Sequence, residues 1–339
     1  MLSEPEDYGL TAAQTLEHRL ADDTVPNGFD AFWAETCEAL SSHPASFRKA
    51  GSSGIVQFES FRSVRINGRL TVPEGAVDAV IITSHGYGNV ADDFAEQPVI
   101  ASAPGAALLE VRVRGYPPSI EEIGDLRDGW IMHRIESAQT WIVRGAVCDI
   151  MQAARCARTR FGNDVAIFLH GESLGAGLAV MAAAQLARLN IAVDRLVIGL
   201  PSLGDWRWRA GRYCNGAGGE INPLIESFRQ ESRAFIERLC LLDAALHGRF
   251  VSCPALCKLA QRDDVVPAPS AAAVYHSLGS DEKWRFVTRY GHFDGGIADA
   301  RRHVVFDQLI SSALDPQQDL ADVMQDVECE LRESRDARW

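Results

Sequence analysis

Long hydrophobic runs are missing from this 339-residue sequence, and no window approaches the ~20 consecutive apolar residues that a membrane-spanning helix needs. Residues 1–8 combine neither a basic start nor an apolar stretch, so we expect no signal peptide. Basic residues are also few, since 33 Lys and Arg stand against 46 Asp and Glu and give a formal net charge of −13. Nucleic acids and anionic membrane surfaces carry charge of the same sign, so the sequence predicts neither as a partner.

Cysteine is too sparse for a disulfide framework, because eight cysteines are scattered along a chain of this length. Cys253 and Cys257 lie close together, but no second pair or nearby histidine completes a zinc site. We expect them to be small buried hydrophobic residues beside a strand. We therefore expect no metal, no other cofactor and a reducing, cytoplasmic location. Internal repeats and low-complexity linkers are absent from the sequence as well.

The sequence does contain enough apolar residues, 47% against 23% charged, to bury a large globular core. Short apolar runs alternate with helical segments, which predicts an α/β fold with a mostly parallel central sheet and helices on both faces. The strands of this sheet are expected within residues 78–89, 106–112, 165–170, 194–200, 254–260 and 284–288. Residues 55–72 predict a β-hairpin whose turn is Asn67-Gly68.

Changes of pattern along the chain predict its organisation. Residues 1–50 form an N-terminal helical arm, and residues 51–314 form the α/β domain. Within that domain, residues 201–250 interrupt the βα rhythm with a helical insertion after the sixth strand. The insertion is placed to cover the carboxyl ends of the strands as a lid, although a plain pair of packing helices explains it equally well. Residues 315–339 form an acidic tail.

The central motif is Gly171-Glu172-Ser173-Leu174-Gly175, which stands between an apolar strand and an alanine-rich helix. A strand, a sharp turn with serine at its apex and a helix are the context that a G-x-S-x-G nucleophile elbow requires. The flanking glycines would let the strand and the helix pass closely. The alternative is a glycine-rich βα turn that contains a serine by chance. We interpret Ser173 as the candidate nucleophile.

Two further candidates follow later strands: Asp263 or Asp264 after residues 254–260, and His292 after residues 284–288. Nucleophile, acid and base in this order are typical of α/β-hydrolases, and parallel strands bring all three loops to one edge of the sheet. Ser173 would attack an acyl carbon, His292 would carry the proton and the aspartate would orient the imidazole. Alternatively, either aspartate caps the following helix.

An oxyanion hole is predicted from the turn His85-Gly86-Tyr87, which ends an early strand. In this fold class one donor comes from that loop and the other from the residue after the nucleophile. The expected donors are therefore the backbone amides of Tyr87 and Leu174. A βα loop with glycines is the alternative interpretation.

Several segments together resemble the acetyl xylan esterase/cephalosporin C deacetylase family of α/β-hydrolases, over about residues 25–312. The segments that carry the resemblance are residues 29–33, His85-Gly-Tyr87, Arg114-Gly115, residues 141–149, the elbow, residues 242–254, residues 263–267 and Gly291-His292. The resemblance implies one α/β-hydrolase domain that removes acetyl groups from small oxygen esters without metal and forms homo-oligomers. It assigns the acid to Asp263, and it suggests that Tyr87, Arg114 and Tyr116 contact the substrate.

The sequence departs from the family pattern at two places near the predicted site. Tyr116-Pro117-Pro118 follows Gly115 where the family continues with Gln-Gly, and Leu174 stands where the family has Gln. These departures leave the acyl group and the alcohol open. A serine carboxylesterase acting on small esters is the leading hypothesis. The alternatives are an acyltransferase that passes the acyl group to an acceptor other than water, and a non-catalytic binding scaffold.

Overall fold

The computed structural model describes residues 8–51, 54–88, 94, 104–127, 129–289, 291–292 and 296–325. In this part of the chain, a nine-stranded sheet runs in the order β1-β2-β3-β5-β4-β6-β7-β8-β9. The strands are β1 (Arg48–Lys49), β2 (Ile55–Glu59), β3 (Arg65–Thr71), β4 (Ala79–Ser84), β5 (Ala106–Arg112), β6 (Ala166–Glu172), β7 (Arg195–Gly199), β8 (Ala255–Ala260) and β9 (Lys283–Thr288).

Six neighbouring strands of this sheet, β5-β4-β6-β7-β8-β9, are parallel, and β1, β2 and β3 extend it as an antiparallel edge. The parallel strands end at the same edge of the sheet, where loops from distant parts of the sequence meet. The predicted α/β architecture with a mostly parallel central sheet is confirmed. The six predicted strands lie within two residues of their expected positions or within the expected range.

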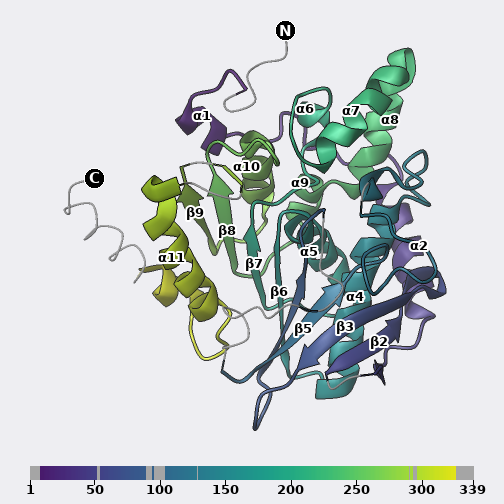
Figure 1. The fold of residues 1–339 in the computed structure, drawn as a ribbon, viewed down its shortest axis with the longest axis vertical. Helices are drawn as coiled ribbons and strands as arrows, with labels where there is room; N and C mark the ends of the chain where they lie inside the picture. Colours follow the sequence, from purple (N-terminus) through teal and green to yellow (C-terminus); the bar gives the residue numbers. More distant parts are fainter. Residues whose placement is uncertain are drawn as a thin grey trace.

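Helices cover both faces of the sheet (Figure 1). Alternate strand residues point to opposite faces, so Val80 and Ile82 of β4 join the larger core while Ala79 and Ile81 join the smaller one. The larger core is covered by α2 (Phe29–Ser41), α4 (Ile142–Phe161), α5 (Leu174–Leu186), α9 (Ala244–Gly248) and α10 (Ala268–Ser277). The smaller core is covered by α11 (Gly296–Ala313).

The segment between β7 and β8 contains α6 (Trp206–Arg209), α7 (Ala217–Ser227), α8 (Ser232–Leu239) and α9. Figure 1 shows α6, α7 and α8 beyond the upper ends of the parallel strands. Two smaller helices, α1 (Ala12–Leu16) and the 3₁₀ helix η2 (Trp130–Met132), complete the surroundings of this end. The helical character expected for residues 201–250 is thus present, whereas the proposed division into domains stays a prediction.

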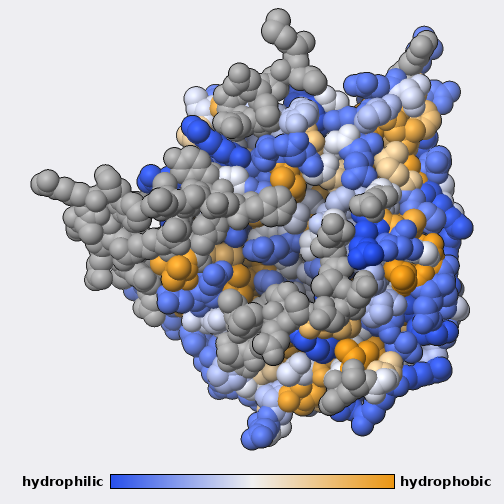
Figure 2. All heavy atoms as spheres, in the orientation of Figure 1, coloured by the Kyte–Doolittle hydropathy of each residue, from blue (hydrophilic) through white to orange (hydrophobic). Residues whose placement is uncertain are grey.

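None of the described helices has both the length and the hydropathy that crossing a bilayer requires. The face in Figure 2 is mostly hydrophilic, with small separate hydrophobic patches, including some near α7 and α8. The described part of the chain also contains no group of three or more His, Cys, Asp or Glu arranged to hold a metal ion.

The predicted hairpin over residues 55–72 is present, but the prediction of its turn was wrong. The connection between β2 and β3 contains the 3₁₀ helix η1 (Phe61–Ser63), and Asn67 and Gly68 lie inside β3, paired with β2. A Cβ atom at Gly68 would lie 2.8 Å from the carbonyl oxygen of Glu110 in β5. Glycine is therefore needed here for the close approach of two strands, not for a turn.

The N-terminal arm differs from its prediction in one element. The short edge strand β1 lies within the arm that was predicted to be helical. Two residues paired at the edge of a sheet give no hydrophobic periodicity that a sequence could reveal.

Candidate active site

Ser173 connects β6 to α5 in a strained turn, with φ of 54° and ψ of −114°. Its amide donates a hydrogen bond of 2.8 Å to the carbonyl of Gly199 at the end of β7, which fixes the turn against the sheet. A Cβ atom at Gly171 would lie 2.5 Å from the carbonyl carbon of Gly175, and one at Gly175 would lie 2.5 Å from the carbonyl oxygen of Ser84. The close packing predicted for the two glycines of the elbow is therefore confirmed.

Asp263 and His292 form a hydrogen-bonded pair in the loops after β8 and β9. Nδ1 of His292 lies 2.7 Å from Oδ2 of Asp263, and the two side chains are 6% and 1% exposed. Oδ1 of Asp263 accepts hydrogen bonds of 2.9 Å from the amides of Val265 and Val266. These two amides hold the carboxylate in one orientation, and an imidazole with its proton on Nδ1 presents Nε2 as an acceptor.

The neighbouring acid, Asp264, has a different set of contacts. Its carboxylate accepts a hydrogen bond from the side-chain amide of Asn215, and its carbonyl accepts one of 2.6 Å from the backbone amide of Asn215. Of the two aspartates that the sequence left as alternatives, Asp263 is therefore the one that contacts His292. Asp264 ties the loop after β8 to the insertion.

A cavity of about 570 Å³ brings the predicted residues together. Ser173, Leu174, Tyr87 and His292 all line it, so the elbow, the oxyanion loop and the histidine loop face one space. The insertion closes the other side with a second group of lining residues, which includes Arg209, Asn215, Gly216, Ala217, Gly218 and Glu220. This volume is within the range usual for small-molecule sites.

The side chain of Tyr87 links the oxyanion loop to the insertion. Its hydroxyl donates a hydrogen bond of 3.0 Å to Oε2 of Glu220 in α7 and accepts one of 3.3 Å from the amide of Ile131 in η2. Its ring packs edge-on against Trp130, with the ring centroids 6.3 Å apart. The loop that carries the candidate oxyanion donor is thus fixed by side chains from two other segments.

The acetyl xylan esterase (AXE1) family model matches residues 10–309. This range includes the elbow, the Asp263–His292 pair, the oxyanion loop and the whole insertion. The chain belongs to the acetyl xylan esterase family. It is accordingly a serine esterase, and the resemblance inferred from the motifs is confirmed.

Solved structures of the same family share the fold. The acetyl xylan esterase from Paenibacillus sp. R4 is 19% identical, with 88% of this chain and 99% of that chain covered at a TM-score of 0.72. The acetyl xylan esterase 1 from Thermoanaerobacterium sp. JW/SL YS485 is 20% identical, with 89% and 99% covered at a TM-score of 0.70. Comparison with curated proteins gives no match.

Other solved structures share the fold over only part of their own length. The acylaminoacyl peptidase from Pyrococcus horikoshii is 16% identical and aligns at a TM-score of 0.55 over 78% of this chain and 41% of that chain. At this level of identity the likeness is evidence for the fold and not for the reaction.

Arg114 does not line this cavity, and its expected contact with the substrate stays a prediction. Its Nη2 lies 2.6 Å from Oδ1 of Asp149, its backbone amide and Nε each lie 3.0 Å from Oδ2, and Nη2 also donates to the carbonyl of Phe61. Both charged side chains are buried. Arg114 therefore fixes the loop after β5 to α4.

Tyr116 is not among the residues that line the cavity either, and its expected contact with the substrate stays a prediction. Its ring is fully buried and packs between His85 and Trp130, with centroid distances of 4.3 and 5.7 Å. Burial raises the pKa of its hydroxyl. Tyr116 therefore supports the histidine that begins the oxyanion loop.

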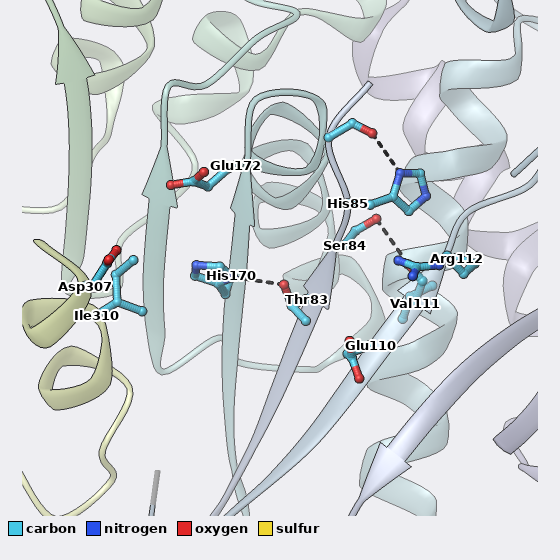
Figure 3. Close-up of a pocket in the computed structure, with 11 residues that line it drawn as sticks. Thr83, Ser84, His85, Glu110, Val111, Arg112, His170, Glu172, Asp307 and Ile310 are labelled. Atoms are coloured by element: carbon cyan, nitrogen blue, oxygen red, sulfur yellow. Dashed lines mark hydrogen bonds between the residues drawn. The ribbon is translucent and has the colours of Figure 1, made fainter. Parts of the chain in front are cut away.

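A second, more polar cavity of about 280 Å³ lies on the other side of Gly86 and Glu172, which line both cavities. Figure 3 shows His170 and Thr83 turned toward each other in it, and Nδ1 of His170 lies 2.9 Å from the hydroxyl of Thr83. Burial lowers the pKa of His170 and of His85 to about 4. Both imidazoles are therefore neutral near pH 7, and neither faces Ser173 across the first cavity.

The sequence missed the residues that the insertion contributes. Arg209, Asn215 and Glu220 line the cavity but belong to no motif, and their segment was interpreted only as a helical insertion. The one available signal was the location of the insertion over the carboxyl ends of the strands, which indicates a lid without indicating which side chains point inward.

Proposed function

We propose that this member of the family is a carboxylesterase that hydrolyses small acetyl esters of alcohols through an acyl-enzyme intermediate. The observation that carries the proposal is the pair Asp263–His292, with its 2.7 Å contact, on the same cavity as the strained Ser173. An acid that orients an imidazole beside a serine is the arrangement needed to activate a hydroxyl for attack on a carbonyl.

Acylation begins when Oγ of Ser173 attacks the ester carbonyl carbon and Nε2 of His292 accepts the hydroxyl proton. Asp263 holds the ring by Nδ1 and stabilises the imidazolium that forms. The carbonyl oxygen becomes an oxyanion, which the backbone amides of Tyr87 and Leu174 would bind. Loss of one such donor typically costs ~3 kcal/mol in the transition state.

Collapse of this intermediate breaks the bond to the alcohol, which takes the proton from His292 and leaves. Water then enters and gives a proton to His292 as its oxygen attacks the acyl carbon. A second oxyanion forms and collapses, and the proton returns to Oγ of Ser173. The products are the alcohol and a carboxylic acid.

Two features of the chain support a small, neutral acyl group. The cavity near Ser173 includes Leu203, Val265 and Val266, whose apolar side chains suit a methyl group better than a charge. The family is named for esterases of acetylated xylan. We infer a cytoplasmic homo-oligomer as well, supported by the resemblance and by the cysteines of the described residues, which are all free and buried. Such an enzyme would meet short acetylated molecules.

Turnover of a chromogenic acetate ester by the wild type and by Ser173→Ala tests the proposal. We expect the variant to lose about 10⁴-fold or more in kcat/KM while it keeps its thermal unfolding midpoint. Undiminished turnover by the variant would refute it. Product analysis with added alcohols and amines separates hydrolysis from acyl transfer, and we expect acetate to be the main product.

A further inference from the structure

Arg209 is a buried cation on the cavity wall opposite the sheet. It is the last residue of α6, it lines the cavity with Ser173 and His292, and it is only 5% exposed. Its guanidinium lies 4.6 Å from the centre of the Trp206 ring, and Nη2 lies 3.8 Å from Sγ of Cys214. No carboxylate of the described residues lies within ion-pair distance of it.

The acidic residues of the same cavity are held by other partners. Nζ of Lys258 lies 3.6 Å from the carboxylate of Glu172, and the hydroxyl of Tyr87 donates to Glu220. The carboxylate of Asp264 accepts from Asn215. The cavity therefore combines three carboxylates that are held by other partners with one guanidinium that stacks on an aromatic ring, contacts a thiol and packs against Gly218.

Burial of a guanidinium costs free energy unless an anion or a set of acceptors compensates for the lost hydration. An aromatic face recovers part of this cost, and a thiol is a weak acceptor. The planar fork of arginine matches the two oxygens of a carboxylate, which it binds through two parallel N–H bonds. The missing anion at this position is most simply supplied by the substrate.

We propose that Arg209 binds a carboxylate on the alcohol part of the substrate. This inference rests on the proposed function, because an acetyl group at Ser173 carries no charge and leaves the alcohol as the only part that can. The enzyme would then select acetyl esters of hydroxy acids over neutral acetyl esters of the same size.

A matched pair of substrates tests this selectivity. 4-Acetoxybutanoate and 4-acetoxybutanamide have the same length and differ in one charge, and the release of acetate gives kcat/KM for each. We expect the wild type to prefer the anionic ester by about tenfold or more, the range of a charge-assisted hydrogen-bonded pair. In Arg209→Gln we expect kcat/KM for the anionic ester to fall until the ratio is about one. Arg209→Lys keeps the charge and retains an intermediate preference.

Arg212→Gln is the matched control, because Arg212 is exposed on the same insertion and stacks on Trp208 outside the cavity. It should keep the wild-type ratio. A wild-type ratio of one or less, or a preference for the cationic ester acetylcholine, overturns the inference. Equal losses for both esters in Arg209→Gln would show that Arg209 only supports the insertion, and a preference for a succinate half-ester would place the charge on the acyl part.

Failure of the proposed function would look different. If no acetate ester is turned over, calorimetry with 4-hydroxybutanoate and 4-hydroxybutanamide still tests Arg209 directly. Tighter binding of the acid that disappears in Arg209→Gln supports the anion site without esterase activity. Equal binding of the acid and the amide by the wild type refutes it.

Discussion

The two walls of the cavity are built in different ways. The wall from the sheet carries Ser173, Asp263 and His292, each at the end of a strand and held by backbone hydrogen bonds or by a buried partner. The wall from the insertion carries Arg209 and Glu220 on short helices, positioned by side-chain contacts. In our proposal the sheet wall carries the chemistry, and the insertion wall distinguishes between substrates.

We expect the largest effect from substitution of the acid that contacts His292 on the sheet wall. We expect Asp263→Asn to lower kcat about 10⁴-fold, because an amide partner favours the wrong tautomer of His292. Asp264→Asn should lose less than tenfold, since the carboxylate of Asp264 is held by Asn215 of the insertion, whereas Asp263 holds His292. Steady-state kinetics with an acetate ester measure both variants. Similar losses in the two would contradict the assignment of the acid to Asp263.

Substitution of Arg114 tests whether this residue contacts the substrate or only stabilises the fold through Asp149. Arg114→Met leaves the buried carboxylate of Asp149 without its cation, which should lower the free energy of unfolding by about 3–5 kcal/mol. Denaturant unfolding measures the loss, and Arg114→Met combined with Asp149→Leu should recover part of it. The KM of the folded single variant should stay near that of the wild type, whereas a KM raised tenfold or more would support a contact between Arg114 and the substrate.

The helix α9 contains His247, a buried histidine that should make stability depend on pH. Burial between Phe29 and Trp33 lowers its pKa to about 4, against about 6.5 in the unfolded chain. Its contribution is complete above pH 6.5 and disappears as the pH falls toward 4, because protonation then favours the unfolded state.

His247→Asn can still donate to the carbonyl of Asp243 but does not titrate. We expect wild type to lose about 3 kcal/mol more than this variant between pH 7 and pH 4. Urea unfolding at both pH values measures the difference, and parallel losses would contradict the assignment.

We expect the smallest effect from removal of the hydrogen bond between Asn215 of the insertion and Asp264 in the loop after β8. Asn215→Ala removes the hydrogen bonds of the side chain to Asp264 and Tyr213 but keeps its backbone bond to Asp264. We expect KM to rise about threefold, with kcat nearly unchanged, because a partly exposed hydrogen bond contributes about 1 kcal/mol or less. A large fall in kcat would mean that the insertion wall takes part in the chemistry.

The contrast between the sheet wall and the insertion wall also explains which residues of the site could be predicted from the sequence. The parallel strands are continuous apolar runs, and the residues that follow them, Ser173, Asp263 and His292, stand at positions that the topology brings together. The choice between Asp263 and Asp264 needed coordinates, because adjacent residues at a strand end point in different directions and only one meets the histidine.

The remaining features depend on tertiary contacts that leave no local pattern. Asn67-Gly68 has the strongest hairpin-turn signal in the sequence, yet the approach of Glu110 explains the glycine. Arg114 has the charge of a binding residue but pairs with Asp149, thirty-five residues further along the chain. Arg209 belongs to no sequence motif, because its proposed role depends only on its position in the folded cavity.

The central claim is that Ser173 is the nucleophile, and covalent labelling measures this most directly. The enzyme would be treated with a fluorophosphonate, digested and examined by mass spectrometry. We predict one adduct, on the hydroxyl of Ser173, which is absent in Ser173→Ala and much slower to form in Asp263→Asn. An active enzyme that forms no adduct, or that is labelled at another residue, would contradict the account.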